Sequence, residues 1–158
     1  MHPTQERTLV ILKPDAVQRS LLGEIIHRFE RKGLKIIGMK MVKLSQVVLE
    51  EHYIHHKDKP FFESLKKQMS AAPVVLIALE GIKAIEAVRM LAGPTKGYEA
   101  PSGTIRGDFS ISKQANVVHA SDSPENAALE IKRFFHDEEL IEYKRSDFEF
   151  VYGEEERE

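Results

Sequence analysis

The chain has 158 residues, of which 42% are apolar, and no cysteine, so it can bury the core of a single domain but cannot form disulfides or thiolate metal sites. No run approaches the roughly 20 apolar residues that cross a bilayer, and the N-terminus lacks a basic-then-apolar leader, so we expect a cytoplasmic protein outside the membrane. The net charge of -2 divides into ten acids and three bases over residues 136–158 and fifteen acids and twenty bases over residues 1–135, which suits a small polyanion better than a nucleic acid.

The first part of the chain predicts a strand, a helix and a second strand. Residues 1–5 show no periodicity and are expected to form a loose end. Residues 8–12 are a β-rich run that stops at Lys13-Pro14, which is typical of a buried central strand. Apolar residues recur at helical spacing over residues 22–29, a helix that Gly33 is expected to end, and residues 37–42 alternate as in a half-exposed strand.

The middle of the chain predicts two helices and a strand. Ser45 is a good helix cap, and the helix it begins is expected to reach about residue 53. After a polar break over residues 55–59, Pro60 is expected to open a second helix that Pro73 stops. Residues 74–79 then have the length and the apolar composition of a strand.

A second strand, helix, strand unit is expected to follow. A helical stripe of apolar residues over 82–91 ends at Gly93-Pro94, and the glycine- and proline-containing stretch 95–103 predicts a surface loop. Residues 115–119 predict a strand. Ser123 caps a helix over residues 124–136, whose inward side chains are expected to be Ala128, Ile131, Phe134 and Phe135.

The C-terminal end of the chain alternates apolar and polar residues. Phe148, Phe150 and Tyr152 have the spacing of a short edge strand, although a segment packed on the body of the protein is an alternative. Residues 153–158 are expected to form a charged tail. Two strand, helix, strand units predict an α+β sandwich, a sheet with helices on one face, while leaving the strand order open. An open parallel sheet is a rival at this stage.

Phosphate binding in this chain must rely on side chains. The sequence contains neither the glycine-rich P-loop nor a Gly-x-Gly-x-x-Gly after a strand. Arg89 and Arg106 could match phosphoryl oxygens with their guanidinium groups, and the hydroxyl of Thr95 could complete the contact. Taken singly, an arginine is more often a surface ion-pair partner than a phosphate ligand.

One histidine stands at a predicted strand-to-helix junction. His119 follows two valines and precedes the helix start Ser123-Pro124. Glu130 on that helix could reach the imidazole, fix its tautomer and leave the other ring nitrogen as a nucleophile. A histidine beside valines is also common as an ordinary core or surface residue, so this motif alone leaves both interpretations open.

The stretch of residues 116–123 resembles the active-site signature of nucleoside diphosphate kinases, in which Asn, two apolar residues, His, Gly or Ala, Ser and Asp follow one another. The resemblance extends from about residue 6 to about residue 152. Its further matches, in the order and approximate spacing of the family, are Lys13-Pro14-Asp15, His52-Tyr53, Lys59-Pro60-Phe61-Phe62, Arg89, Thr95 and Thr104-Ile105-Arg106-Gly107-Asp108.

The resemblance implies a fold and an activity for the whole chain. The expected fold is the ferredoxin-like βαββαβ arrangement with a four-stranded antiparallel sheet, in one domain over residues 1–158. The expected activity is ping-pong transfer of the γ-phosphate from a nucleoside triphosphate to a nucleoside diphosphate. Magnesium is expected to be bound through the nucleotide phosphates. A homo-oligomer is expected, with a hexamer favoured over a tetramer.

The resemblance also assigns roles to particular positions. His119 would take the phosphoryl group on Nδ1, and Glu130 and Ser121 would orient its ring. Lys13 and Asn116 would contact the sugar hydroxyl and the terminal phosphate, and Tyr53 would lie beside the transferring group. The remaining nucleotide contacts would be the phosphate ligands Arg89, Thr95 and Arg106, the base-stacking ring of Phe61, and Leu65 in the same slot.

Some positions depart from the family pattern. Gly97 stands where proline is common, Pro101-Ser102-Gly103 replaces Ala-Pro-Gly, and Ser20 replaces a usual glycine. Because the loop that contains the first two helps to pack three subunits in hexameric members, these departures weaken the expectation of a hexamer more than that of activity. Phenylalanines also replace a frequent tryptophan near the C-terminus.

Two further expectations concern metals and alternative functions. His52, His55 and His56 lack a zinc-like flanking pattern, so we expect exposed helix-end residues there and no metal held by the protein. A nucleotide- or nucleic-acid-binding module on the same fold would be favoured if the nucleophile were missing, but His119 is present. Transfer of the phosphoryl group from His119 to other proteins is a third hypothesis.

Overall fold

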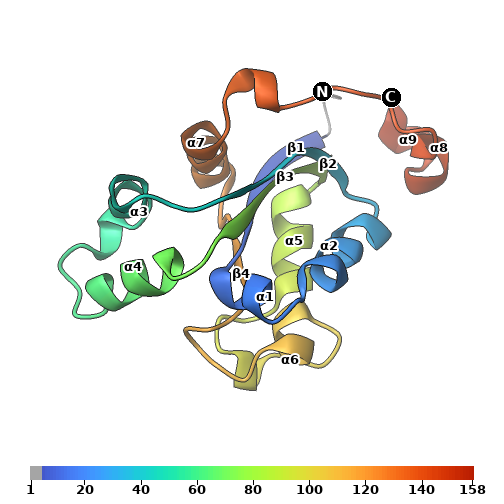
Figure 1. The fold of residues 1–158 in the computed structure, drawn as a ribbon. Helices are drawn as coiled ribbons and strands as arrows, with labels where there is room; N and C mark the ends of the chain where they lie inside the picture. Colours follow the sequence, from blue (N-terminus) through green and yellow to red (C-terminus); the bar gives the residue numbers. More distant parts are fainter. Residues whose placement is uncertain (1–4) are drawn as a thin grey trace.

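The computed structural model describes residues 5–158, and within that range four strands form one antiparallel sheet in the order β2-β3-β1-β4 (Figure 1). The strands are β1 (Gln5–Leu12), β2 (Lys35–Val42), β3 (Val74–Ile82) and β4 (Val118–Ala120). The order confirms the ferredoxin-like βαββαβ arrangement and removes the parallel-sheet rival. Residues 1–4 of the expected loose end lie outside the described residues, and Gln5 already belongs to β1, so the expectation is wrong for that residue.

The central strand β1 organises both layers of the core. It pairs with β3 from Gln5 opposite Ile82 to Leu12 opposite Val75, and with β4 at Val10, Ile11 and Leu12. Successive side chains of a strand point to opposite faces of the sheet. Val10 and Leu12 therefore enter one apolar cluster, while Leu9 and Ile11 enter the other, and all four are fully buried. The prediction of a buried central strand is confirmed.

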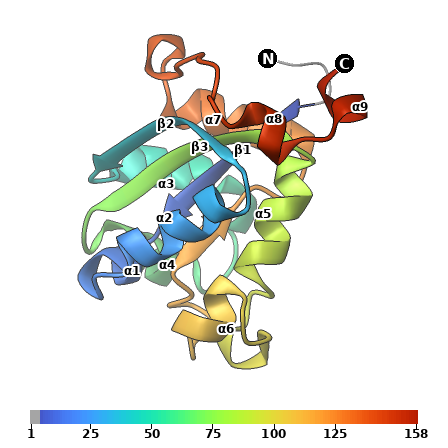
Figure 2. The same cartoon turned by 90° about the vertical axis from the view of Figure 1, so that its right-hand side faces the viewer.

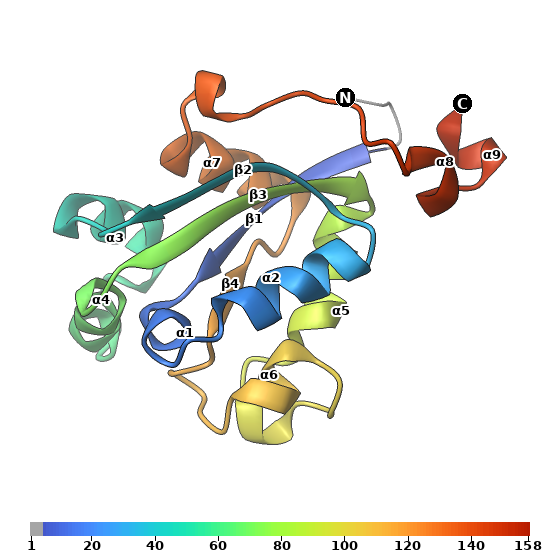
Figure 3. The same cartoon turned by 45° about the vertical axis from the view of Figure 1, so that its right-hand side comes forward.

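Helices cover both faces of the sheet, so the expectation of helices on one face is wrong (Figures 2 and 3). Both faces are apolar and both must be covered. The first cluster contains residues of α1 (Pro14–Gln18), α2 (Leu22–Arg31), α5 (Ala84–Ala92) and α6 (Ile105–Phe109). The second cluster contains residues of α3 (Gln46–His52), α4 (Phe62–Ser70) and α7 (Pro124–Phe134).

Several predicted boundaries shift by a few residues. Ile82 ends β3 and does not begin the next helix, because Lys83 turns the chain with a φ of 48° before α5. Strand β4 is shorter than the predicted strand 115–119, because Val117 has a φ of 62° that no extended strand allows. The helix expected over 124–136 ends at Phe134. Ala127 is buried in this helix, whereas Ala128, which was predicted to point inward, is exposed.

Short helical turns occupy segments for which the sequence predicted neither a helix nor a strand. They are the 3-10 turns Ile54–His56, Gly97–Glu99 and Asp137–Glu139, together with α6, which follows the predicted loop. Ser20, where the resembled family usually has glycine, has a φ of 58°, a conformation that favours glycine. The helices within residues 5–158 are each too short or too polar to span a bilayer.

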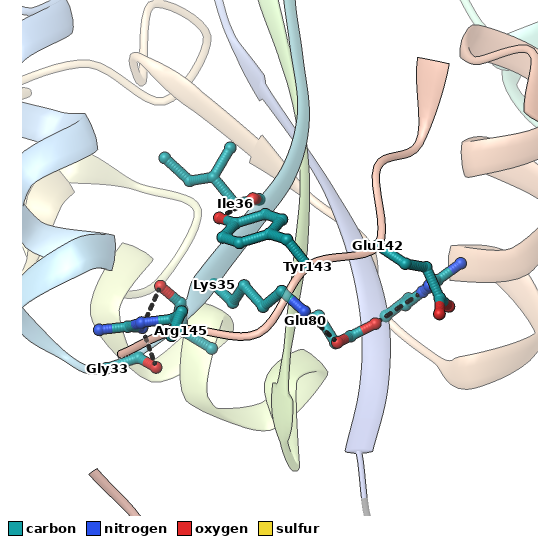
Figure 4. Close-up of polar contacts among 9 residues, drawn as sticks. Gly33, Lys35, Ile36, Glu80, Glu142, Tyr143 and Arg145 are labelled. Carbon is teal, nitrogen blue, oxygen red and sulfur yellow. Dashed lines mark hydrogen bonds and ion pairs between the residues drawn. The ribbon is translucent and has the colours of Figure 1, made fainter. Parts of the chain in front are cut away.

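The C-terminal end is helical, so the prediction of an edge strand over Phe148–Tyr152 is wrong. It forms α8 (Phe148–Val151) and α9 (Glu154–Arg157). The segment just before α8 lies along the outer edge of β2 instead, where the Ile141 amide donates to Ile37 and the Tyr143 hydroxyl donates to Ile36 (Figure 4). These contacts occupy backbone groups that an edge strand would otherwise leave open.

A buried carboxylate joins this C-terminal segment to the sheet. The side chain of Glu80 on β3 is only 5% exposed and lies 2.9 Å from Arg7 on β1 and 3.4 Å from Lys35 on β2. The ammonium group of Lys35 also lies 4.6 Å from the ring centroid of Tyr143 (Figure 4). Arg145 donates from one guanidinium nitrogen to the carbonyls of Gly33 and Leu34. Two cations on β1 and β2 thus share the buried carboxylate of Glu80, and Glu142 of the C-terminal segment lies 2.9 Å from Arg7.

We expect Glu80→Gln to lower the free energy of unfolding by about 2 kcal/mol, because the partly buried cations Lys35 and Arg7 lose a buried carboxylate partner, although Arg7 keeps the exposed Glu142 at 2.9 Å. Urea denaturation measures this. The matched control is Glu86→Gln, since Glu86 is exposed and only 4.0 Å from exposed Lys83, and its effect should stay below about 0.5 kcal/mol. Equal effects of the two substitutions would contradict this account of the buried network.

Candidate functional site

The imidazole of His119 is held by a carboxylate. His119 lies on β4 and Glu130 lies on α7, and their Nε2 and Oε2 atoms are 2.6 Å apart. Helix α7 begins as predicted, because the Ser123 hydroxyl accepts from the Asn126 amide. Burial, the largest single cause, raises the pKa of the Glu130 carboxyl, but the hydrogen bond and charge of His119, the charge of His52 and the Ser121 hydroxyl together hold it below the usual value. An ionised carboxylate only accepts, so Nε2 carries the proton and Nδ1 keeps its lone pair.

Ser121 supports this pair through Glu130 and through β1. It is fully buried, and its hydroxyl lies 3.3 Å from both the amide and the carbonyl of Leu9. The Ser121 hydroxyl also contributes to lowering the pKa of Glu130. The structure therefore places Ser121 against the carboxylate rather than giving it a direct hydrogen bond to the His119 ring.

His52 is a neighbour of this pair that sequence reasoning treated as an exposed helix-end residue, which is wrong. It is 6% exposed, its Nδ1 lies 3.7 Å from Glu130 Oε2, and its ring centroid lies 4.8 Å from that of His119. Burial first and His119 second lower the pKa of His52 to about 3, so its ring is neutral at physiological pH. The motif His52-Tyr53 was the signal that could have placed it here.

His52, His119 and Glu130 also have potential ligand atoms within 4.8 Å of one another. The guanidinium group of Arg133 lies 2.8 Å from Nδ1 of His52, however, and a second cation is disfavoured beside it. The expectation that the protein itself holds no metal remains a prediction.

Lys13 directly follows β1 and has a buried ammonium group. Its Nζ donates to Oδ1 of Asn116 at 2.8 Å and to the carbonyl of Gln114 at 2.7 Å. Burial lowers its pKa to about 8, Asp15 opposes this shift and Arg106 adds to it. The side-chain amide of Asn116 donates in turn to the carbonyl of Thr95 at 2.9 Å. Lys13, Asn116 and Thr95 are thus one connected group.

Arg106 approaches the same segment from α6. Its guanidinium group donates to the carbonyls of Gly93 at 2.8 Å, Val118 at 2.6 Å and Asn116 at 3.3 Å. Burial and the nearby charge of Arg89 lower its pKa to about 10. Arg89 itself is exposed on α5. Two guanidinium groups that repel each other form a region of positive potential, which favours an anion between them.

A strained turn carries the residues that face this region. Val117 is fully buried, has a φ of 62°, and is bridged by a hydrogen bond of 2.8 Å from the Val118 amide to the Asn116 carbonyl. This is the pattern of a γ-turn, which for a β-branched residue costs on the order of 1–3 kcal/mol. Such strain persists only where the surroundings hold it.

A row of aromatic and histidine rings connects His119 with Phe61, the residue predicted to stack on the base. Phe61 is 44% exposed at the start of α4, near half-buried Leu65. The ring centroids of Phe61 and His56 are 5.1 Å apart, and those of His56 and Tyr53 are 6.4 Å apart. The Tyr53 centroid lies 4.6 Å from that of His52, which packs against His119. Tyr53 is buried, and burial raises the pKa of its hydroxyl. Phe61, which could stack on a base, and His119 thus lie at the two ends of one continuous row of rings.

The buried charge of Lys13 predicts a pH-dependent stability. Its pKa is lower in the folded chain than the ordinary 10.5, so the unfolded chain binds more protons between pH 8 and 10.5. Compared with Lys13→Met, the wild-type chain should therefore gain stability as the pH rises from 8 to 10.5, by on the order of 3 kcal/mol in total. Urea midpoints of both proteins over this range measure the difference, and a flat difference would contradict the buried ammonium.

Comparisons with known proteins agree with this geometry. The family model described as nucleoside diphosphate kinase matches residues 6–140. The nucleoside diphosphate kinase of Parabacteroides distasonis is 55% identical over 151 residues, which cover 96% of this chain and 99% of the relative. That of Staphylothermus marinus is 57% identical over 138 residues, covering 87% and 98% of the two chains.

Solved structures give the same answer for the fold. A halophilic nucleoside diphosphate kinase from Halobacterium salinarum in complex with CDP has a TM-score of 0.92 at 41% identity, covering 94% of this chain and 99% of that one. A transition-state mimic of the Borrelia burgdorferi enzyme with bound vanadate and ADP has a TM-score of 0.85 at 38% identity, covering 91% and 95%. Sequence motifs, fold and relatives together establish that the chain belongs to the nucleoside diphosphate kinase family.

Proposed function

We propose that His119 is the phosphoryl carrier of this nucleoside diphosphate kinase. The observation that carries the proposal is the 2.6 Å contact between Nε2 and Glu130, because it commits one ring nitrogen and leaves the lone pair of Nδ1 for attack. Nδ1 attacks the γ-phosphorus of a nucleoside triphosphate, the bond to the β-phosphate oxygen breaks, and the diphosphate leaves with the electron pair. Attack by an acceptor diphosphate on the phosphohistidine then restores the imidazole.

Glu130 stabilises the ring while it carries the phosphoryl group. A phosphorylated imidazole that keeps its Nε2 proton gains positive charge, and the ionised carboxylate beside Nε2 offsets that charge. Ser121 adds to the effect of His119 and His52, which lower the pKa of this carboxylate. The same residues serve both half-reactions, since one histidine must hold the group while the product leaves.

The phosphates are assigned to the cationic group of Lys13, Arg89 and Arg106, with Thr95 and Asn116 completing the contacts. Phosphoryl transfer depends mainly on positioning and charge neutralisation, which this group provides. Burial of Lys13 and Arg106 strengthens their electrostatic effect. Magnesium enters as part of the substrate, bound between phosphate oxygens and water. The vanadate and ADP bound in the Borrelia burgdorferi structure support this use of the fold.

The nucleoside is assigned to the exposed ring of Phe61, with Leu65 beside it and Tyr53 between this slot and the histidine. Stacking on a ring is open to every base because each has a π-face. We therefore expect broad tolerance for the base among donors and acceptors.

We further propose that the whole chain works as one kinase domain, in the cytoplasm, as a homo-oligomer with a hexamer favoured over a tetramer. The edge strand β2 exposes Met39 and Met41, 54% and 56% accessible, which is consistent with a subunit contact. Light scattering on a gel-filtered sample tests this expectation, and a monomer would refute it.

Incubation with magnesium and ATP, without an acceptor, should add one phosphoryl group to the wild-type chain and none to His119→Ala. Intact-mass measurement records the gain, which should be acid-labile and should disappear when GDP is added. ATP binding to both proteins is the control. No mass gain by wild-type protein that binds ATP would overturn the role of His119.

Arg106→Ala should lower kcat by on the order of 10³-fold, because an arginine that neutralises the transferring phosphate contributes this much in phosphoryl transfer. Arg31→Ala, which removes an exposed arginine from α2, is the matched control and should leave kcat unchanged. Circular dichroism verifies that both variants remain folded. A folded Arg106→Ala with wild-type kcat would remove Arg106 from the cradle.

A further inference from the structure

Asp15 belongs to a matched motif but has no role in the reaction described above. It lies in the first turn of α1, two residues after Lys13. Its Oδ2 accepts a hydrogen bond of 2.9 Å from the amide of Val117, which is 102 positions further along the chain. Its Oδ1 is buried and has no hydrogen-bond partner among residues 5–158. A carboxylate fixed in this way has a more specific task than surface solvation.

The amide that Asp15 binds belongs to the strained turn. Val117 keeps its φ of 62° because three backbone or side-chain contacts converge on it: the Asp15 carboxylate accepts from its amide, its carbonyl accepts from the Lys13 amide at 2.9 Å, and the turn closes between Val118 and Asn116. Asp15 is the one side chain in this set. A substitution at Asp15 therefore removes one of the contacts that hold the turn.

The proposed phosphate ligands Lys13, Arg106 and Asn116 depend on the position of this turn. Asn116 precedes Val117 and receives the Lys13 ammonium, while Arg106 donates to the carbonyls on both sides of Val117, those of Asn116 and Val118. His119 follows one residue later, opposite Ile11 of β1. A shift of the turn would move the nucleophile and the cations relative to each other.

An acid in the first turn of a helix also interacts favourably with the helix end, which is the simpler explanation. Helix α1 has only five residues, however, and its first residue is a proline that is already suited to that position. A bond to the helix end alone would not require the carboxylate to reach the amide of Val117. The geometry favours the contact across the fold.

We propose that Asp15 is a positioning residue that holds the Val117 turn and thereby sets the geometry between His119, Lys13 and Arg106. The inference rests on the proposed roles of these three residues. Asp15 has a second effect through its charge, because it is the acid that faces Lys13. The other groups facing that ammonium are Arg106 from α6 and the oxygens of Asn116 and Gln114. The Asp15 carboxylate supports the positive charge of Lys13 against its burial.

Two substitutions separate the effects of geometry and charge. Asp15→Asn keeps an oxygen that can accept from the Val117 amide but removes the negative charge. Asp15→Ala removes both. We expect Asp15→Ala to lower kcat roughly 10- to 100-fold with a small change in KM, because the turn is displaced while the base slot on α4 stays intact. We expect Asp15→Asn to keep most of kcat near pH 7, while the alkaline limb of its pH profile moves to lower pH because Lys13 loses its proton more easily.

The control is Glu24→Ala, which removes an exposed acid from the first turn of α2 and should change neither kcat nor the pH profile. Steady-state kinetics from pH 6 to 10 and phosphohistidine stoichiometry by intact mass are measured on the full chain. If Asp15→Ala does not fold, Asp15→Glu, which keeps the charge but moves the carboxylate by one methylene group, tests the geometry and should also lower kcat. Wild-type kcat for the folded variant, Asp15→Ala or Asp15→Glu, would overturn the positioning role, and an unshifted limb for Asp15→Asn would overturn the charge effect on Lys13. A wild-type chain that forms no phosphohistidine would instead refute the proposed function.

Discussion

The pairing of β1 with a strand on each side is the constraint on which the rest of the molecule depends. Because β1 is central, its alternating side chains belong to both apolar clusters, and its last residue delivers Lys13 to the end of the sheet. The register with β4 sets Ile11 opposite His119. One strand therefore sets the position of both the histidine and Lys13 along the sheet.

The cationic group is stabilised by backbone carbonyls more than by acids. Lys13 and Arg106 donate to four carbonyls and one side-chain amide oxygen, which satisfy their hydrogen bonds but leave their positive charge largely uncompensated. An uncompensated buried charge weakens the fold. Attraction for a polyanionic ligand recovers this cost when the nucleotide binds, so we expect nucleotides to stabilise the chain strongly. The carboxylates nearby are reserved for orientation, Glu130 for the ring and Asp15 for the backbone.

Sequence reasoning predicted the fold class well because the patterns of β1, α2 and α7 are local. Apolar runs, the serine cap and the proline at the helix start are each written within a few residues. The covered second face was missed because it follows from the strand order, which no local pattern contains. The start of β4 was misplaced because Val117 has high β propensity, while contacts with distant Asp15 and Lys13 help to hold it in a γ-turn.

The motifs named residues that the structure brings together around His119 and Lys13, but they did not predict the surroundings of these residues. His52 was misjudged because a histidine at a helix end gives no sign of whether it faces solvent, and its burial depends on packing against His119 and Phe134. The spacing of Phe148, Phe150 and Tyr152 fits a strand, and this alternative is wrong. The other alternative, a segment packed on the body, agrees with the position of Val151 beside Gly33 and of Tyr152 beside Gly81. Tertiary contacts at Tyr143 and Arg145 had already taken the edge of the sheet.

The strand order also has a kinetic consequence. The two strands that bring Lys13 and His119 together are separated by more than 100 residues, so their pairing closes a long loop late in the search for the native state. A chain that has not yet paired β4 with β1 lacks His119 opposite Ile11 and therefore lacks the proposed site. Enzymatic activity should therefore appear only after β4 has paired with β1. Its recovery during refolding would follow the slowest long-range contact of the chain.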